Sequence, residues 1–455
     1  MPKKTQREVL QTPKGTHDIL PQDFPYWQKI LAVGEDLATF YGFRRIETPH
    51  FEKTDLFLRT LGETSDVVEK QMYSFRTRGG DALTLRPEGT APVARAFIEH
   101  GMVSWPQPVK LFYYGSFFRH ESSQRGRFRE FGQFGFEMMG DDDPVADALI
   151  MRLFYSMLAE LGFKNIAVQV NTMGDEESRA AFKKELTAYY RKRVNSLCKD
   201  CKRRLKENPL RLLDCKDPGC LELKENAPQT IKYLSDASRR QFKAVLEYLD
   251  EGAIPYFLNP HLVRGFDYYT GTVFETFINC EDGAVSPETE VLAGEEEKAD
   301  KPQKPLPLAM AAGGRYDHLI YQLGGKQTPA VGGAMGVDRI IQEMKTQGLK
   351  PAPTPHPKLF LVQLGPAAKR KIFALMEEFR RAGILVAESL SRDSIKTQLK
   401  IASKIGVEHA LILGQKEALE GTVIIRELST GAQETVFVKD VIEEVRTRMR
   451  GKKAR

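Results

Sequence analysis

The segment Phe117–Gly140, FFRHESSQRGRFREFGQFGFEMMG, constrains the fold of this chain more than any other feature. Gln133, Gly135 and Glu137 alternate with phenylalanines, and a period of two residues is the pattern of a β-strand. An arginine-rich loop separates that strand from an apolar-aromatic run that ends at Arg119. We therefore predict two strands joined by a cationic loop, with polar groups on one face for a phosphate and a small polar molecule. A basic surface hairpin without a site is the alternative interpretation.

Length and composition indicate a globular protein with room for several domains. A chain of 455 residues corresponds to about three domains of ~150 residues, and 41% hydrophobic residues allow a large core. Lys and Arg number 67 against 61 Asp and Glu, and the net charge of +6 permits a polyanionic partner without requiring one. No apolar run approaches ~18 residues, so we expect no membrane span.

The first residues, MPKKTQREVLQTPKGTHDILP, contain no apolar core followed by a small-residue cleavage site. We therefore expect no secretion and a cytoplasmic location, where the five cysteines would be reduced thiols.

Changes in composition along the chain indicate its organisation. We expect a first domain over residues 1–345, interrupted at 175–252 by a charged, helical, cysteine-bearing insertion. Residues 281–307 are acidic and poor in aromatics, which is typical of a disordered surface loop. A proline-rich linker over 346–357 then leads to an α/β domain over 358–455, in which strand and helix patterns alternate.

Local signals predict several individual elements. Asp143 and Pro144 form a helix cap with proline at the first helical position. Pro49 indicates an edge or interface strand, because proline cannot donate to a β-ladder. AVGGAMGV predicts a strand, and the DRIIQEM that follows it predicts a helix.

Four arginines stand beside glycines or at predicted strand ends: Arg119, Arg264, Arg315 and Arg339. Any one of them alone would be interpreted as a surface salt bridge. Together, planar guanidinium groups from separate elements suit the oxygens of a triphosphate and its developing charge. The sequence contains neither a G-x-x-x-x-G-K-[ST] loop nor a G-x-G-x-x-G turn before a helix, so arginines would have to replace a phosphate-binding loop.

A second set of polar residues predicts a small-molecule pocket. It consists of Glu88, Gln133, Glu137, Tyr268 and Tyr269. Carboxylates bind an ammonium group, and a hydrogen-bonding pocket rejects ligands that lack the matching groups. No Ser-His-Asp or Cys-His pair is evident, so covalent catalysis by the protein is not expected.

Four cysteines fall in two close pairs, Cys198 with Cys201 and Cys215 with Cys220. Their type and number fit a structural Zn²⁺ site with four thiolates. The second pair has four intervening residues instead of two, so free thiols remain the alternative. A zinc ion here would stabilise the insertion and take no part in catalysis. Cys280 stands alone and is interpreted as a packed residue.

Several motifs resemble a known family. FFRHE and RFREF resemble motif 2 of the class II aminoacyl-tRNA synthetases, and GGAMGVDR resembles their motif 3. LRPEGT, LVRGFDYYTGTVFE and AAGGRYD are similar to the histidyl-tRNA synthetases in particular. The resemblance runs from PKGTHDILP at residue 13 through the C-terminal domain. It implies an α+β fold with a class II antiparallel sheet flanked by helices, a helical insertion, and a C-terminal α/β anticodon-binding domain.

The resemblance also implies a reaction and its partners. The carboxylate of L-histidine would attack the α-phosphorus of ATP, which acts with Mg²⁺, to give histidyl-adenylate and pyrophosphate. The histidyl group would then be transferred to the 3′ end of tRNA(His). The loop Ser122–Arg129 would meet the acceptor end of the tRNA. The enzyme would be a homodimer without a membrane association, and Pro49 would be the motif 1 proline at its interface.

Individual roles follow from the same resemblance. Arg264 and Arg119 would be catalytic, near the α-phosphate. ATP would be bound by Arg119, Glu121, Arg127, Phe131 and Arg339. Histidine would be bound by Glu88, Gly89, Thr90, Arg119, Gln133, Glu137, Arg264, Tyr268 and Tyr269.

Two features depart from the family pattern. Asp338 stands where motif 3 usually has glutamate, and the acidic stretch 281–307 is longer than expected. Two other functions remain as alternatives. One is a catalytically inactive paralogue that regulates an early enzyme of histidine biosynthesis, although such relatives usually lose the motif arginines and the C-terminal domain. The other is a pure RNA-binding protein.

Overall fold

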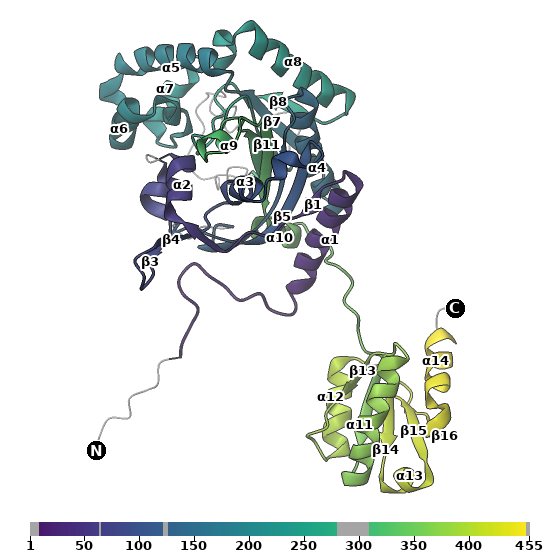
Figure 1. The fold of residues 1–455 in the computed structure, drawn as a ribbon. Coiled ribbons are helices and arrows are strands. Elements are labelled where there is room, and N and C mark those ends of the chain that lie inside the picture. Colours follow the sequence, from purple (N-terminus) through teal and green to yellow (C-terminus); the bar gives the residue numbers. More distant parts are fainter. Residues whose placement is uncertain (1–8, 63–64, 122–125, 280–308, 452–455) are drawn as a thin grey trace, which may run out of the picture. The chain divides into compact units, whose positions relative to one another are not determined.

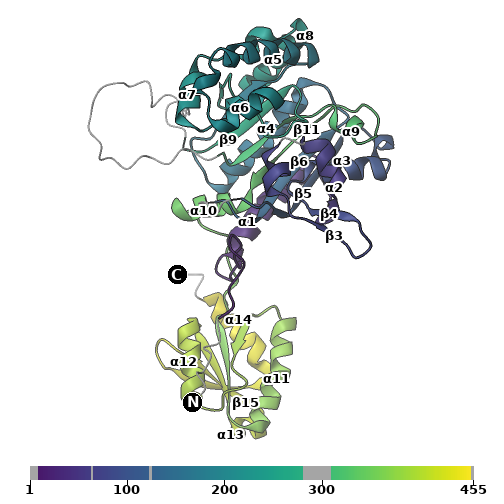
Figure 2. The ribbon, with the colours of Figure 1, turned by 90° about the vertical axis from the view of Figure 1, so that its left-hand side faces the viewer.

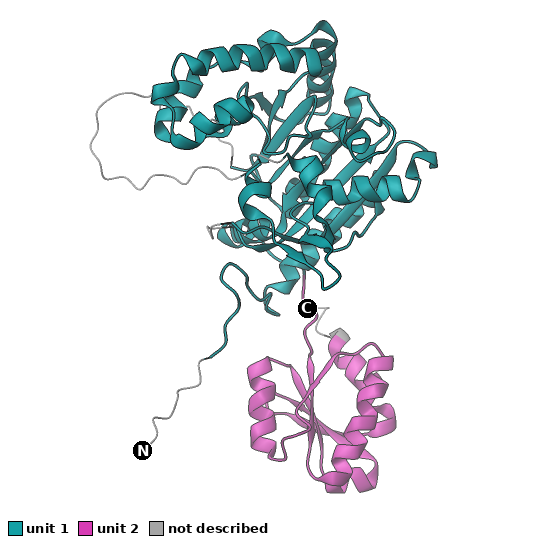
Figure 3. Cartoon of the chain, turned by 60° about the vertical axis from the view of Figure 1, so that its left-hand side comes forward, with its two compact units in different colours: residues 1–352 teal, residues 353–455 magenta. Residues whose placement is uncertain are grey.

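A computed structural model of the chain describes residues 9–62, 65–121, 126–279 and 309–451. The chain divides into two compact units, residues 1–352 and 353–455 (Figure 3). The boundary falls inside the segment predicted as a proline-rich linker. The predicted acidic loop and Cys280 lie outside the described residues.

The first unit is built on an eight-stranded sheet (Figure 1). Neighbouring strands pair antiparallel except at the two ends of the sheet, where β1 pairs parallel with β5 and β7 parallel with β8. In spatial order the strands are β1 (Arg44–Arg45), β5 (Val109–Phe118), β6 (Glu130–Met139), β11 (Ala330–Gly336), β10 (Ala311–Arg315), β9 (Thr272–Phe277), β7 (Ala167–Thr172) and β8 (Tyr256–Leu258).

The predicted hairpin is confirmed in β5 and β6, which pair from Val109 opposite Met139 to Phe118 opposite Glu130. Alternation along β6 divides its side chains between the two faces of the sheet. Phe134 and Phe136 are fully buried in the larger hydrophobic core. Gln133, Gly135 and Glu137, which alternate with these phenylalanines, therefore face the other side of the sheet.

Helices cover the face that carries these phenylalanines, and their apolar side chains complete the larger core. The predicted cap is confirmed, because the Asp143 carboxylate accepts a hydrogen bond from the N–H of Val145 at 2.9 Å, with Pro144 at the first helical position. The covering helices are α1 (Phe24–Phe40), α4 (Pro144–Leu161), α8 (Asp236–Glu251) and α10 (Val337–Thr346).

Shorter elements cover the opposite face and enclose a second core. They include a three-stranded antiparallel sheet that carries the segment between Pro49 and Pro87. Pro49 itself lies outside the strands, between β1 and β2. The elements on this face are β2 (Phe51–Lys53), α2 (Thr54–Leu61), η1 (Val67–Gln71), β3 (Ser74–Arg76), β4 (Ala82–Leu85), α3 (Thr90–Glu99), η2 (Met102–Ser104) and α9 (Leu319–Gln322).

Helices also fill the chain between β7 and β8, where the insertion was predicted (Figures 1 and 2). The first begins at Asp175, whose carboxylate accepts a hydrogen bond from the N–H of Ser178 at 2.9 Å. Before α8, the insertion contains α5 (Glu176–Arg191), η3 (Val194–Ser196), α6 (Lys199–Glu207), η4 (Pro209–Asp214), α7 (Pro218–Glu225) and η5 (Thr230–Tyr233).

The second unit is a five-stranded mixed sheet with apolar residues on both faces. The strand order is β13 (Val386–Glu388), β12 (Leu359–Gln363), β14 (His409–Leu413), β15 (Thr422–Glu427) and β16 (Gln433–Phe437). Its helices are α11 (Pro366–Arg381), α12 (Ile395–Ile405), α13 (Gln415–Glu420), η7 (Val438–Asp440) and α14 (Val441–Gly451). The predicted α+β class, with its antiparallel sheet, helical insertion and C-terminal α/β domain, is confirmed. No helix of the described residues is long and apolar enough to cross a membrane.

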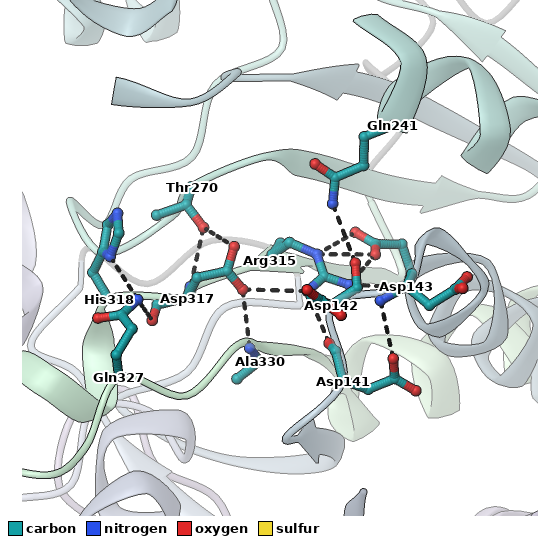
Figure 4. Close-up of polar contacts among 11 residues, drawn as sticks. Asp141, Asp142, Asp143, Gln241, Thr270, Arg315, Asp317, His318, Gln327 and Ala330 are labelled. Carbon is teal, nitrogen blue, oxygen red and sulfur yellow. Dashed lines mark hydrogen bonds and ion pairs between the residues drawn. The ribbon is translucent and has the colours of Figure 1, made fainter. Parts of the chain in front are cut away.

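One of the four predicted phosphate-binding arginines has a structural role instead. Arg315 is 1% exposed, and its Nε lies 3.0 Å from Oδ2 of Asp147, which is on α4. Its other nitrogens donate to Asp317 and to the backbone carbonyls of Asp141 and Asp143 (Figure 4). With its donors taken up by protein acceptors, the Arg315 guanidinium ties β10 to the start of α4. The prediction that it binds phosphate is wrong.

Removing the partner of this buried arginine should be costly. We predict that Asp147→Ala lowers the free energy of unfolding by about 3–5 kcal/mol, because it leaves the Arg315 charge buried and unpaired. Lys243→Ala, which breaks an exposed ion pair with Glu247, should cost less than about 1 kcal/mol. Urea unfolding followed by tryptophan fluorescence reports on this unit alone, since both tryptophans, Trp27 and Trp105, lie in it. Equal costs for the two variants would contradict the assignment.

Candidate active site

A cluster of buried polar groups, here the Glu137 cluster, lies on the sheet face opposite the larger core. Glu137 is fully buried on β6, opposite Gly332 of β11. A side chain at Gly332 would put its Cβ 1.7 Å from a Glu137 oxygen, so only glycine leaves room for the carboxyl group. Three hydroxyl groups donate to Glu137: those of Thr90 at 2.7 Å, Tyr113 at 3.4 Å and Tyr316.

Burial raises the pKa of Glu137 to about 8, although the hydroxyls of Tyr316, Thr90 and Tyr113 stabilise its charged form. The nearby charge of Glu88 acts in the same direction as burial. The cluster therefore holds a carboxyl group whose proton is available at neutral pH. Such a group can exchange a proton with a ligand that titrates in the same range.

Glu88 is the second buried carboxyl group of the cluster. Its oxygens accept hydrogen bonds from the backbone N–H groups of Thr90 at 2.8 Å and Ala91 at 2.9 Å, at the start of α3. The Tyr268 hydroxyl lies 3.4 Å from Oε2. Burial raises the pKa of Glu88, against the two N–H groups. Gln133, predicted to be on the same strand face as Glu137, has a buried Oε1 without a partner among the described residues, so the site presents an acceptor for a ligand's N–H.

Two glycines fit around the ring of Tyr113. A Cβ at Gly89 or at Gly135 would lie 2.3 or 2.2 Å from ring carbon Cζ of Tyr113. The ring thus occupies the space that these side chains would take, and its hydroxyl reaches Glu137. This packing is a sufficient reason for glycine at residue 89, whose predicted contact with histidine stays a prediction.

Arg264 and the two tyrosines after it lie beside the Glu137 cluster. The Tyr268 and Tyr269 rings are 4.6 Å apart, and the Arg264 guanidinium carbon is 5.7 Å from the centroid of Tyr269. Arg264 forms an ion pair with Glu275 of β9 at 2.5 Å. Burial would lower the pKa of Arg264, but Tyr269 and Glu275 raise it, so its charge is secure.

Arg119 lies between the tyrosines and the predicted nucleotide side. Its Nε donates to the carbonyl of Pro87 at 2.8 Å, and its guanidinium carbon is 5.5 Å from the ring centroids of Phe131 and Phe266. The ion pair with Glu121 is longer, at 3.7 Å. Counted over the described residues, most of the hydrogen-bonding capacity of Arg119 therefore remains for a ligand.

Arg339, the last of the four predicted arginines, lies near Arg119 and Arg127. Burial and the positive charges of Arg127 and Arg119 lower the pKa of Arg339, while the carboxylates of Glu121 and Glu275 oppose them. Arg119 in turn has its pKa lowered by burial and by Arg264, against nearby carboxylates. We name Arg119, Arg127, Arg264 and Arg339 the arginine group. Like charges held this close repel one another, and a polyanion would relieve that repulsion.

The four cysteines of the insertion also converge. Their sulfur atoms all lie within 4.8 Å of one another, and those of Cys198 and Cys215 are 3.8 Å apart. Backbone N–H groups point at two of the sulfurs, from Cys198 to Cys220 at 3.3 Å and from Cys201 to Cys198 at 3.4 Å. Among the described residues, no other group of three or more His, Cys, Asp or Glu side chains with this geometry is found.

Comparisons with known proteins identify the family. The family model described as histidyl-tRNA synthetase matches residues 15–287, and that of an anticodon binding domain matches residues 358–448. The histidine–tRNA ligase of Dehalococcoides mccartyi is 41% identical over 438 residues, which are 96% of this chain and 99% of the relative. The chain belongs to the histidyl-tRNA synthetase family. The histidine–tRNA ligase of Caldicellulosiruptor saccharolyticus is also 41% identical, over 97% of this chain and all of the relative.

Solved structures agree. The crystal structure of apo histidyl-tRNA synthetase from S. aureus has a TM-score of 0.75 and 31% identity, and the match covers 96% of this chain and 99% of that one. The predicted resemblance to the histidyl-tRNA synthetases is confirmed. The activity of this family, ligation of histidine to tRNA, is the activity of this chain.

Within this family pattern, Asp338 makes contacts that the sequence did not indicate. One of its oxygens accepts a hydrogen bond from the N–H of Gly132 at 2.6 Å, and the other lies 3.4 Å from Nε2 of His17. The His17 ring packs 4.3 Å from that of Phe128. Asp338 thus connects motif 3 to the start of β6 and to the N-terminal segment.

Sequence reasoning missed three residues of the candidate site. Tyr113 and Tyr316 donate to Glu137, and Glu275 pairs with Arg264. Tyr316 stands in AAGGRYD beside Arg315, where the arginine drew attention instead. Glu275 interrupts an apolar strand, TVFETF, and that interruption was the available signal.

The buried carboxyl group should make stability depend on pH. The pKa of Glu137 is about 8 when folded against 4.5 for a model carboxyl, so the folded protein holds an extra proton between these values. That stabilisation is complete at low pH and is lost as the pH rises to about 8. We predict that wild type loses up to about 1.4 kcal/mol per pH unit relative to Glu137→Gln over this window, and nothing further above it. Urea unfolding at several pH values measures the difference, and parallel curves would contradict the prediction.

Proposed function

We propose that the Glu137 cluster binds the histidine substrate and that the arginine group binds ATP. The observation that carries this proposal is the junction of the two sets: Arg119 and Arg264 stand beside the tyrosines that border the buried carboxyl groups. A histidine held in the cluster would have its own carboxylate next to these arginines and the nucleotide beyond them.

On the histidine side, Glu88, Thr90 and Gln133 would bind the α-amino group. The support is the free acceptor Oε1 of Gln133 and the buried carboxyl of Glu88. Glu137 and Tyr269 would hydrogen-bond the imidazole, while Tyr268 would border the same space. An imidazole and a carboxyl with a raised pKa titrate in overlapping ranges, which favours a shared proton.

On the nucleotide side, Arg119 would contact the α-phosphate and the histidine carboxylate. Arg127 and Arg339 would contact the outer phosphates or the base. Glu121 would accept from the adenine amino group, and Phe131 would stack on the adenine ring. The ion pairs of Glu121 with Arg119 and Arg127 are 3.7 and 3.6 Å long, and such long pairs yield readily to a ligand.

The chemistry would be an in-line displacement. The histidine carboxylate attacks the α-phosphorus, pyrophosphate leaves, and the terminal ribose hydroxyl of tRNA later attacks the adenylate carbonyl. Arg264 would stabilise the charge that develops on the α-phosphate, together with Arg119, because fixed cations in a buried site stabilise developing charge strongly. The protein would supply position and charge, and no covalent intermediate with it is required.

Mg²⁺ acts with ATP in this family. Of the carboxyl groups near the arginine group, Glu121 and Glu275 are paired with arginines, and the oxygens of Glu88 accept hydrogen bonds from backbone N–H groups at the start of α3. This donor set does not fit a preformed site for a divalent cation among the described residues, so we propose that Mg²⁺ arrives on the phosphates of ATP.

The partners follow the same assignment. The second unit, matched by an anticodon-binding family, would read exposed bases of tRNA(His). The loop Ser122–Arg129, part of which lies outside the described residues, would meet the acceptor end. We also propose a homodimer with Pro49 at its interface and a cytoplasmic location, where translation takes place.

Removing the Arg264 side chain should stop the first step. We predict that Arg264→Ala lowers histidine-dependent ATP–pyrophosphate exchange at least about 100-fold, because a preorganised charge is lost, while histidine binding stays measurable. Arg264→Lys restores a charge without the planar fork and should recover part of the rate. Arg380→Ala, in the second unit, should exchange at the wild-type rate, since no tRNA is involved. Full exchange by Arg264→Ala would remove Arg264 from catalysis.

The four cysteines would hold a structural Zn²⁺. Four sulfurs bound at ~2.3 Å around one ion lie about 3.8 Å apart, which is the separation of Cys198 and Cys215. The backbone N–H groups aimed at the sulfurs stabilise thiolates, the form that binds zinc.

Metal analysis tests this site. We predict one Zn²⁺ per chain in protein purified without chelators, and its loss in Cys201→Ser, because three thiolates bind zinc more weakly than four. Cys280→Ser should retain the ion, since the set of four is complete without it. Metal-free wild type with all its thiols open to a thiol reagent would establish free thiols instead.

A further inference from the structure

We propose that the ion held by the four cysteines positions the histidine-binding tyrosines as well as stabilising the insertion. This inference rests on the proposed zinc site. The residue concerned is Asn208, at the junction of α6 and η4. It would act as a positioning residue for the ligase reaction and would touch neither the substrates nor the reacting atoms.

The cysteines bring together three elements of the insertion, α6, η4 and α7. Cys198 caps α6 and Cys201 lies in its first turn, Cys215 follows η4, and Cys220 lies in α7. In the sequence these elements are short, and α6 is strongly charged. Leu205 and Leu212 add apolar packing between α6 and η4, and the cysteines lie in the same small core. Short elements with so small a core gain stability from a bound metal, so an ion held by the cysteines would fix their arrangement.

From α6 and η4, polar side chains reach back to the segment before motif 2. Arg204 and Arg211 share Asp66 at 3.0 and 2.9 Å, and Arg203 contacts Glu69 at 2.5 and 3.0 Å. Gln71, at the end of that segment, accepts a hydrogen bond from the N–H of the residue after Arg119 at 2.7 Å.

A second connection leads directly to the histidine side. The Asn208 side chain donates to Oδ1 of Asp267 at 2.9 Å. Asp267 immediately precedes Tyr268 and Tyr269, and Arg179 of the insertion donates to the carbonyl of Tyr269 at 2.8 Å. The Asp267 carboxylate also lies against Gly62, where a Cβ would be 2.1 Å from it, so a side chain at residue 62 would displace it.

Apolar packing follows the same route. Leu210 of η4 and Val263 pack against both the core that contains Cys201, Cys215 and Cys220 and the core that contains Tyr268 and Tyr269. Val263 immediately precedes Arg264. The path from the cysteine cluster to Arg264, Tyr268 and Tyr269 therefore consists of side-chain contacts as far as Val263 and Asp267, and of chain neighbours from there.

The connection predicts coupling between the metal and the amino acid. If the bound ion favours the arrangement that binds histidine, histidine must favour retention of the ion by the same factor. A merely structural metal would not show this reciprocity.

The experiment follows removal of zinc from the full chain by a coloured chelator, with saturating L-histidine or with D-histidine. D-Histidine controls for the affinity of the free amino acid for zinc. We predict that L-histidine makes the zinc at least about fivefold harder to remove, the lower end of usual coupling. In Asn208→Ala, which keeps all four cysteines, the ratio should fall towards one and the KM for histidine should rise, while the contacts through Arg179 and Leu210 retain part of the coupling. The KM for ATP should change little.

Lys206→Ala, on the exposed side of α6, is the matched control and should behave as wild type. If zinc binds but L- and D-histidine have the same effect on its removal, the positioning role is overturned and the structural zinc site stands. If no zinc binds to wild type, the zinc site itself fails. A normal histidine KM in Asn208→Ala with zinc retained would also overturn the positioning role.

Discussion

The Glu137 carboxyl can lie on the sheet because Gly332, the residue of β11 that pairs with Glu137, has no side chain. That one absence leaves a space between two strands which an acidic group fills, and burial there makes its proton easy to share. The hydroxyls that surround it come from α3, from β5 and from the residue after β10. Three parts of the chain are thus held at fixed positions around a single carboxyl group, and the arginine group is positioned beside them.

Arginines in this protein are distinguished by what remains for them to bind. Arg315 donates its hydrogen bonds to Asp147, Asp317 and two backbone carbonyls, so no donor remains for a ligand. Arg264 and Arg339 each keep a buried Nε without a partner among the described residues, and Arg119 has one short hydrogen bond to a carbonyl. Buried donors without partners and neighbouring like charges both raise the free energy of the folded protein. A bound triphosphate would remove both costs.

The sequence was sufficient where the deciding contact is local. Alternation along β6, the Asp143 cap and the cysteine pairs are patterns within a few residues, and each led to a correct arrangement in space. It was insufficient where the partner is distant. Arg315 meets Asp147 across 168 residues, and Tyr316 meets Glu137 across 179, so no local period marks either contact. The family motifs placed the strands that carry these residues, but motif membership does not tell a buried ion pair from a ligand contact.

Thr90 is bonded to both carboxyl groups at once, through its backbone to Glu88 and through its hydroxyl to Glu137. A shift in the position of either carboxyl group is therefore transmitted to the other through Thr90. A substitution at one carboxyl group would disturb the other through this shared residue, so the effects of two such substitutions on stability would not simply add. On the proposed assignment, a change of the bound amino acid would therefore require several of these positions to be replaced together.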